Sequence, residues 1–60
     1  MKTKVNNMPE YAWNYKYIVA SIDYEGHWFW GAYNDVMIAL EVARTIDAGV
    51  LPIEEIEKID

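Results

Sequence analysis

Residues 15–33 read YKYIVASIDYEGHWFWGAY. Two runs rich in aromatic and β-branched residues, 15–22 and 27–33, lie on either side of a turn formed by Asp23, Tyr24, Glu25 and Gly26. Aromatic and β-branched runs around an Asp…Gly turn are typical of a β-hairpin. We therefore predict a β-hairpin over residues 15–33, against which the rest of the chain packs.

The register of this hairpin has two alternatives. If the turn is a three-residue loop with Gly26 in the left-handed conformation, Asp23 faces His27. One face of the hairpin then carries Ile18, Ala20, Ile22, Trp28, Trp30 and Ala32, and the other carries Tyr17, Val19, Ser21, Phe29, Gly31 and Tyr33. A two-residue Glu25-Gly26 turn shifts the pairing by one residue and moves both tryptophans to the opposite face. Neither register leaves a polar face, so we expect both faces to need cover.

A helix is predicted over residues 35–48. Asn34 or Asp35 suits the N-cap position, and Gly49 suits the position just past the helix end. At 100° per residue its apolar side chains cover an arc of about 200°, which is wider than one contact with a sheet requires. The arc contains Val36, Ile38, Ala39, Leu40, Val42, Ala43 and Ile46, and it leaves Met37 exposed.

The segments outside the hairpin and the helix carry weaker signals. Residues 1–9 are polar without a period and are predicted to be a loose leader, whereas residues 11–14 suit either a strand or a helical turn. Residues 50–53 are predicted to form a short strand that Pro52 confines to a sheet edge. Residues 54–60 are predicted to be an acidic tail or a short helix. The predicted fold is one small α+β domain, with an antiparallel sheet in the order β-β-α-β and the main helix on one face.

Length and composition exclude several classes of protein. Sixty residues make one domain, which buries only about 60% of the surface of its unfolded chain and is therefore marginally stable. The chain has no cysteine and a single histidine, which argues against disulfides and zinc sites. Its net charge of −5 argues against nucleic acid as a partner, because phosphate contacts need clustered basic residues. No secretory signal or membrane-spanning run is recognisable, so we expect a cytoplasmic protein.

Candidate catalytic and metal sites are weak. Asp23, Glu25 and His27 alternate around the turn, and such side chains can bind a divalent ion, but Asp and Gly are also expected there for turn formation alone. Ser21 and Thr45 have no base near them in the sequence, and no glycine-rich phosphate loop is present. We therefore predict a protein that is not an enzyme and has no metal or cofactor.

The remaining aromatic and acidic residues point to contacts with proteins. One helix covers one face of a small sheet, and the other face would expose more apolar surface than a monomer usually tolerates. A homodimer, or a complex with another protein, would cover it. The expected contact residues are Tyr17, Phe29, Tyr33 and either Trp28 or Trp30, with Glu54, Glu55 and Glu57 steering association.

The segment YEGHWFWGAYND (24–35), followed by ALEVA (39–43), gives the chain a layout that resembles small bacteriophage-encoded accessory proteins. The resemblance spans about residues 15–51 and concerns this layout alone. It implies an inhibitor that occupies a surface of a host enzyme, such as a nucleic-acid enzyme, or of a host defence complex. Two alternatives stand beside it: a structural or assembly subunit that acts through homo-oligomerisation, and a single-stranded nucleic-acid binder that uses the aromatic sheet face.

Overall fold

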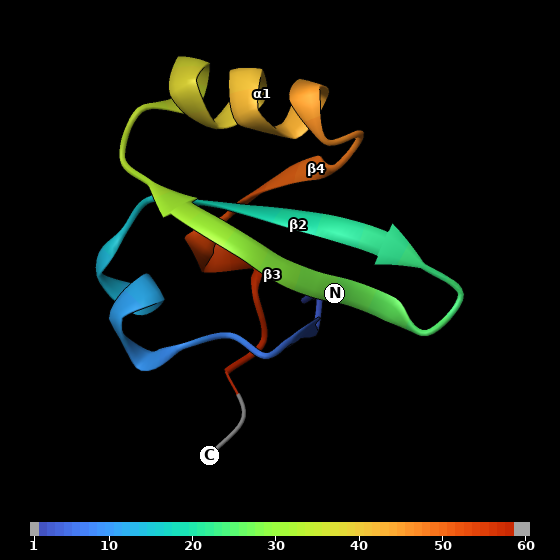
Figure 1. The fold of residues 1–60 in the computed structure, drawn as a ribbon. Coiled ribbons are helices and arrows are strands. Elements are labelled where there is room, and N and C mark those ends of the chain that lie inside the picture. Colours follow the sequence, from blue (N-terminus) through green and yellow to red (C-terminus); the bar gives the residue numbers. More distant parts are fainter. Residues whose placement is uncertain (1, 59–60) are drawn as a thin grey trace.

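The structure of the protein is a computed structural model that describes residues 2–58. Four strands form one sheet in the order β1-β3-β2-β4, and one α-helix lies across it (Figure 1). The elements in chain order are β1 (Val5–Asn6), the 3-10 helix η1 (Glu10–Asn14), β2 (Tyr17–Asp23), β3 (Gly26–Tyr33), α1 (Val36–Thr45), β4 (Gly49–Pro52) and the 3-10 helix η2 (Ile53–Glu55). The α+β class and the single main helix are confirmed.

The sheet is mixed, whereas the sequence predicts an antiparallel one. β2 pairs antiparallel with both β3 and β4, as expected, but β1 pairs parallel with β3 through Val5 and Asn6. Val5 is buried, and the side-chain amide of Asn6 donates a hydrogen bond to the carbonyl of His27 at 3.1 Å. The prediction of a loose leader is therefore wrong for this segment, because two residues are too few to show a strand period in the sequence.

The hairpin has a register that neither alternative anticipates. Asp23 pairs with Gly26, so Tyr24 and Glu25 form the loop, and Gly26 has a φ of 122°. From Val19 to Tyr17 the pairing is the one expected for the three-residue loop, with Val19 opposite Gly31. The two halves differ by one residue because a β-bulge at Trp30 takes up the difference. Sequence patterns of period two cannot reveal such an insertion.

The helix begins where the sequence indicates and ends early. The carboxylate of Asp35 caps α1 by accepting the backbone N–H groups of Met37 at 2.8 Å and Ile38 at 3.4 Å. At the other end Asp47 has a φ of 56°, and the N–H of Ala48 donates to the carbonyl of Ala43 at 2.7 Å. This is a Schellman ending, and it terminates α1 at Thr45 because Asp47, rather than Gly49, takes the left-handed position.

α1 covers one face of the sheet. Ala39 and Ala43 are buried against Val19 of the central strand. Because alanine is small, the helix approaches the sheet closely at these two positions. The partly buried side chains that complete this layer are Tyr17, Tyr33, Val42, Ile46, Ala48 and Val50.

The opposite face is covered by the chain itself. Ile18 and Ala20 of β2 are buried there beneath Ala12 of η1 and Val5 of β1. Ile56 closes this cluster from the C-terminal segment, and Met8, Trp13, Phe29, Ala32, Leu51 and Ile53 pack around it. The expectation that this face lies open to a second copy or another protein is therefore wrong, because residues 3–14 and 53–56 fill it.

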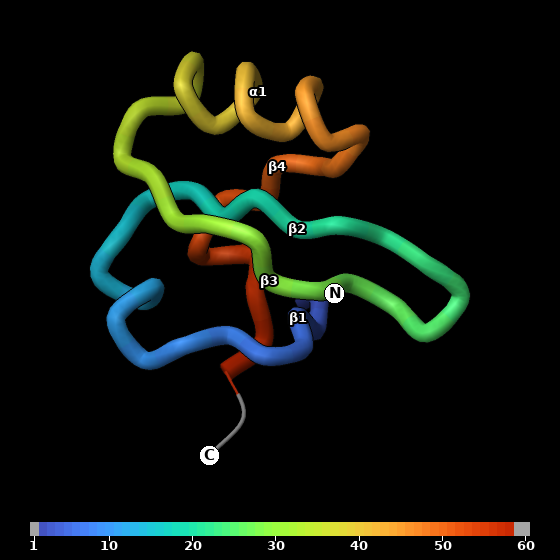
Figure 2. Tube along the Cα trace, viewed as in Figure 1, coloured from blue at the N-terminus to red at the C-terminus, as the bar shows by residue number. Residues whose placement is uncertain are grey.

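The two ends of the described chain meet below the sheet, as the trace shows (Figure 2). β4 lies at the sheet edge, as predicted, and η2 follows Pro52 directly. Ile56 then forms a parallel bridge with Thr3. The predicted tail over 54–60 is thus built into the fold as far as this bridge, while residues 59 and 60 lie outside the described residues.

Candidate protein-binding surface

The first half of α1 carries apolar side chains in positions exposed to solvent. Val36, Met37, Ile38 and Leu40 expose 39%, 71%, 53% and 50% of their surface, respectively. We call these four residues the apolar helix surface. Only Ala39 in this half of the helix is buried, so the chain presents apolar groups around most of the helix circumference. Consecutive exposed apolar residues on a helix are unfavourable in water unless they serve a contact.

The residues of this surface lie on different flanks of the helix. β3 and β4 run parallel on either side of β2, and α1 connects them over the sheet, as a right-handed crossover does (Figure 1). Ile38 precedes the buried Ala39 by 100° and Leu40 follows it by 100°. In a right-handed crossover this places Ile38 on the flank above β3 and Leu40 on the flank above β4.

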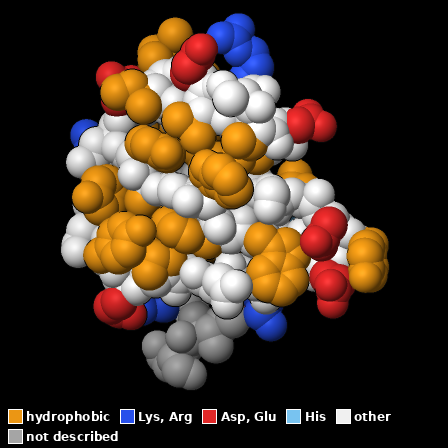
Figure 3. Space-filling model, viewed as in Figure 1, with side chains coloured by type: hydrophobic (Ala, Val, Ile, Leu, Met, Phe, Trp, Pro, Cys, Tyr) orange, Lys and Arg blue, Asp and Glu red, His pale blue; other side chains and the backbone are white. Residues whose placement is uncertain are grey.

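α1 carries no net charge beyond its N-cap. Glu41 and Arg44 pair with each other at 2.5 Å, and both side chains are mostly exposed. The space-filling view shows hydrophobic side chains over α1 and spread across the face below it, with charged groups mainly towards the rim (Figure 3). In a chain of net charge −5, this helix is thus an electrically balanced part of the surface.

The structure separates the aromatic residues that the sequence proposes as contacts. Trp30, in the bulge, is exposed at 57% of its surface, which suits a contact residue. Tyr17 and Tyr33 are half-buried beneath α1, and Phe29 is half-buried against the opposite cluster. Trp28 is half-buried, and its indole N–H donates to the Asp23 carboxylate at 3.1 Å. These four side chains therefore have structural roles in the fold.

The acidic residues that the sequence assigns to steering are all on the surface. Glu54, Glu55 and Glu57 are exposed, in and just after η2. They follow α1 and β4 in the sequence, and the backbone around them belongs to the bridge with Thr3. The bridge holds the backbone at Glu55 and Glu57.

The side chain of Asp23 accepts two hydrogen bonds at the hairpin turn. The carboxylate of Asp23 accepts the N–H of Glu25 at 2.8 Å in addition to the indole N–H of Trp28. These bonds account for the Asp at the start of the turn. Within residues 2–58 the structure contains no group of three or more His, Asp or Glu side chains placed to hold a metal ion.

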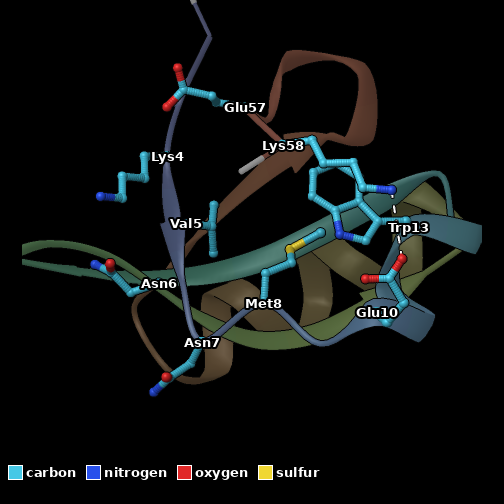
Figure 4. A pocket seen from close by; sticks show the side chains of 9 residues that line it. All are labelled: Lys4, Val5, Asn6, Asn7, Met8, Glu10, Trp13, Glu57 and Lys58. Atoms are coloured by element: carbon cyan, nitrogen blue, oxygen red, sulfur yellow. Dashed lines mark ion pairs between the residues drawn. The ribbon is translucent and has the colours of Figure 1, made fainter. Parts of the chain in front are cut away.

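A hollow of about 280 Å³ lies where the two ends of the chain meet (Figure 4). The Lys58 ammonium lies 5.3 Å from the ring centre of Trp13 and 3.6 Å from the carboxylate of Glu10. Figure 4 shows Met8 turned towards Trp13, whereas Lys4 and Asn7 point outward. The hollow is at the lower limit for ligand pockets, roughly 300 Å³, and charges of both signs line it, so no ligand class is indicated.

The apolar helix surface was not recognised from the sequence, although a signal for it exists. The predicted apolar arc of about 200° is wider than one sheet contact needs, and two alanines stand at its centre. Two small residues at the centre let the helix lie close to the sheet while the larger residues on the flanks stay outside. The sequence pattern places Val36, Ile38 and Leu40 in the apolar arc, whereas the structure shows them exposed.

Comparisons with known proteins give no relative: no family model, no curated protein and no solved structure matches the chain. Among residues 2–58, the structure contains no helix with the length and apolar character needed to cross a membrane.

Proposed function

We propose that this protein is a non-enzymatic protein-binding module whose contact surface is the apolar helix surface. One observation carries the proposal: residues 36–40 expose four apolar side chains on a helix that already packs on its own sheet through Ala39. Contiguous exposed apolar surface on a small protein marks an interaction site. The ordinary requirements of the fold do not explain it, because both faces of the sheet are already covered.

The chemistry of this surface suits docking onto another protein. Burying apolar area contributes about 25 cal/mol per Å², so these side chains supply a driving force without any polar group to desolvate. Met37 is the most exposed of the four, and methionine adapts its shape to different partner surfaces. Trp30 of β3, outside the apolar helix surface, is a further exposed aromatic ring, and tryptophan is enriched at interface hot spots.

The more specific role that we propose is that of an inhibitor which occupies a surface on a larger protein, such as a host enzyme or a defence complex. It is supported by the resemblance in layout to phage accessory proteins and by the net charge of −5. Exposed carboxylates at Glu54, Glu55 and Glu57 would accelerate association with a basic partner surface. The apolar helix surface would then supply the lasting contact.

The experiment compares three tagged forms of the full chain in a bacterial lysate: the wild type, Leu40→Glu and Ile22→Glu. Leu40 and Ile22 are both exposed aliphatic residues, at 50% and 62%, but Ile22 lies in β2 near the hairpin turn. Captured proteins are eluted in steps of salt and identified by mass spectrometry. We expect a protein that the wild type and Ile22→Glu capture equally and that Leu40→Glu does not.

One result would count against the proposal, and another would require a different variant. If all three forms capture the same proteins equally, the apolar helix surface is not the contact. If Leu40→Glu has lost the circular dichroism spectrum of the wild type, its loss of binding reflects unfolding, and Met37→Ser then replaces it, since Met37 is 71% exposed. Elution by moderate salt would support steering by the glutamates, whereas a salt-independent complex would contradict it.

A structural subunit that acts through homo-oligomerisation is the second candidate. The specific observation in its favour is the balanced charge of α1, where Glu41 and Arg44 neutralise each other. Two acidic copies can approach each other through such a face without strong repulsion.

A further inference from the structure

Methionine supplies all the sulfur of this chain. The sequence has three methionines and no cysteine, so their thioethers are the side chains most open to mild oxidation. Met8 and Met37 are among the residues that the structure describes, and Met1 lies outside them. The surroundings of the two described methionines decide which of them an oxidant reaches first.

Met37 is the accessible methionine of the two, and Met8 is the shielded one. Met37 exposes 71% of its surface in the first turn of α1, within the apolar helix surface. Met8 is half-buried, packs against the cluster beneath β2 and turns towards Trp13 (Figure 4). Because oxidation follows the exposure of the sulfur, we expect an oxidant to react with Met37 before Met8.

We propose that Met37 is a site of reversible oxidation that switches the apolar helix surface off. This inference rests on the proposed function, since it concerns the regulation of the same surface. The oxidant is hydrogen peroxide, which reaches an exposed thioether without a binding site of its own. The sulfur attacks one peroxide oxygen with an electron pair, the O–O bond breaks, and the S–O bond of a sulfoxide forms. The sulfur is thereby oxidised and the peroxide reduced, and the second oxygen leaves as water after taking the proton of the first.

Oxidation changes the apolar helix surface at its most exposed residue. The sulfoxide is polar, whereas Val36, Ile38 and Leu40 are the other members of this surface and carry only hydrocarbon side chains. A partner that covers the surface would have to take the sulfoxide out of water against these side chains. Burial of a polar group without a hydrogen bond is unfavourable enough to weaken binding by about tenfold or more. The oxidised protein should therefore release its partner.

The fold should survive the oxidation. α1 packs on the sheet through Ala39 and Ala43, and in the described part of the chain both hydrophobic clusters form without Met37. Met37 takes part in the helix cap through its backbone N–H, which donates to Asp35, and oxidation leaves that group unchanged. Methionine sulfoxide reductases convert the sulfoxide back to methionine, so the change is reversible.

Oxidation of the free protein tests the site without any partner. The full chain is treated with limiting hydrogen peroxide, and peptide mass spectrometry follows the added oxygen at each methionine. We expect Met37 to be mostly oxidised while Met8 is mostly intact, with an unchanged circular dichroism spectrum. Retention on a hydrophobic-interaction column should fall in the wild type and in Met8→Leu. It should fall much less in Met37→Leu, which keeps the other two methionines.

The capture experiment tests the consequence for binding. Peroxide is removed first, and the bacterial lysate is dialysed so that it cannot repair the sulfoxide. The wild type and Met8→Leu should each capture the partner about tenfold less after oxidation than before it, and methionine sulfoxide reductases should restore the capture. In Met37→Leu the treated and untreated proteins should capture equally, whatever the level of capture by this variant.

The outcomes separate this inference from the proposed function. Equal oxidation of Met8 and Met37, an equal loss of retention in Met37→Leu, or unfolding of the oxidised protein would each contradict the switch. If Leu40→Glu loses capture while the wild type oxidised at Met37 keeps it, the switch is overturned and the proposed function stands. If Leu40→Glu captures as well as the wild type, the proposed function fails and the switch fails with it.

Discussion

Thr3 and Ile56 lie side by side as a parallel bridge and join the two ends of the fold. The N–H of Thr3 donates to the carbonyl of Glu55 at 2.7 Å, and the carbonyl of Thr3 accepts the N–H of Glu57 at 2.7 Å. Thr3 continues into β1, which pairs with β3, and Ile56 follows η2 and β4 on the other side of the sheet. The bridge thereby closes the chain around the cluster beneath β2.

Ile56→Ala tests the importance of this closure. Ile56 is 2% exposed, and removal of a buried isoleucine side chain costs about 2–5 kcal/mol. A domain of this size has roughly 3–5 kcal/mol of stability in total, so the variant should be largely unfolded or have a much lower urea midpoint. Ile22→Ala, at a position 62% exposed, should change the free energy of unfolding by less than about 0.5 kcal/mol. Equal midpoints for the two variants would contradict the closure.

Asp35→Ala tests the helix cap. The carboxylate accepts two backbone N–H groups at the start of α1, and loss of an N-cap side chain costs about 1 kcal/mol. Chemical denaturation followed by circular dichroism should show this loss. Asp35→Ser keeps an accepting oxygen and should recover most of the stability. If the serine variant is as unstable as the alanine variant, the hydrogen bonds are not the cause.

Trp30→Ala and Phe29→Ala should differ although the two residues are neighbours. Trp30 stands in the bulge with 57% of its surface exposed, whereas Phe29 packs against the cluster around Ile18. We expect Trp30→Ala to cost less than about 1 kcal/mol of unfolding free energy and Phe29→Ala about 3 kcal/mol. The comparison is made by urea denaturation. A larger cost at Trp30 would mean that its ring is part of the core.

The sequence shows much of the fold because several signals are local. The turn chemistry of Asp23 and Gly26, the cap at Asp35 and the edge strand at Pro52 all depend on residues within a few positions of one another. The helix ends three residues before the predicted position because Asp47 adopts a left-handed conformation that glycine usually takes.

The rest depends on contacts between distant residues. Two features leave no periodic pattern in the sequence: the bulge at Trp30 and the parallel pairing of Val5 with His27. The cover of the second sheet face also comes from residues distant in the sequence, so the expectation that a second copy or another protein covers this face is wrong. The helical pattern alone places Leu40 in the apolar arc, whereas the structure shows it 50% exposed.

Gly31 marks a close approach that a methyl group would disturb. A Cβ atom built on Gly31 would lie 2.7 Å from the hydroxyl oxygen and 2.9 Å from Cε2 of Tyr33. Tyr33 is held over this spot because its ring packs against the Val19 cluster, so it cannot move away freely. Gly31→Ala should therefore lower the free energy of unfolding by about 1–3 kcal/mol, as overpacking does.

In a Tyr33→Ala background the clash is gone, and Gly31→Ala should be neutral or stabilising, because glycine weakens a strand interior. Urea denaturation of the wild type, the two single variants and the double variant gives the coupling energy between positions 31 and 33. A coupling energy near zero would show that the Tyr33 ring does not hinder a Cβ atom at position 31.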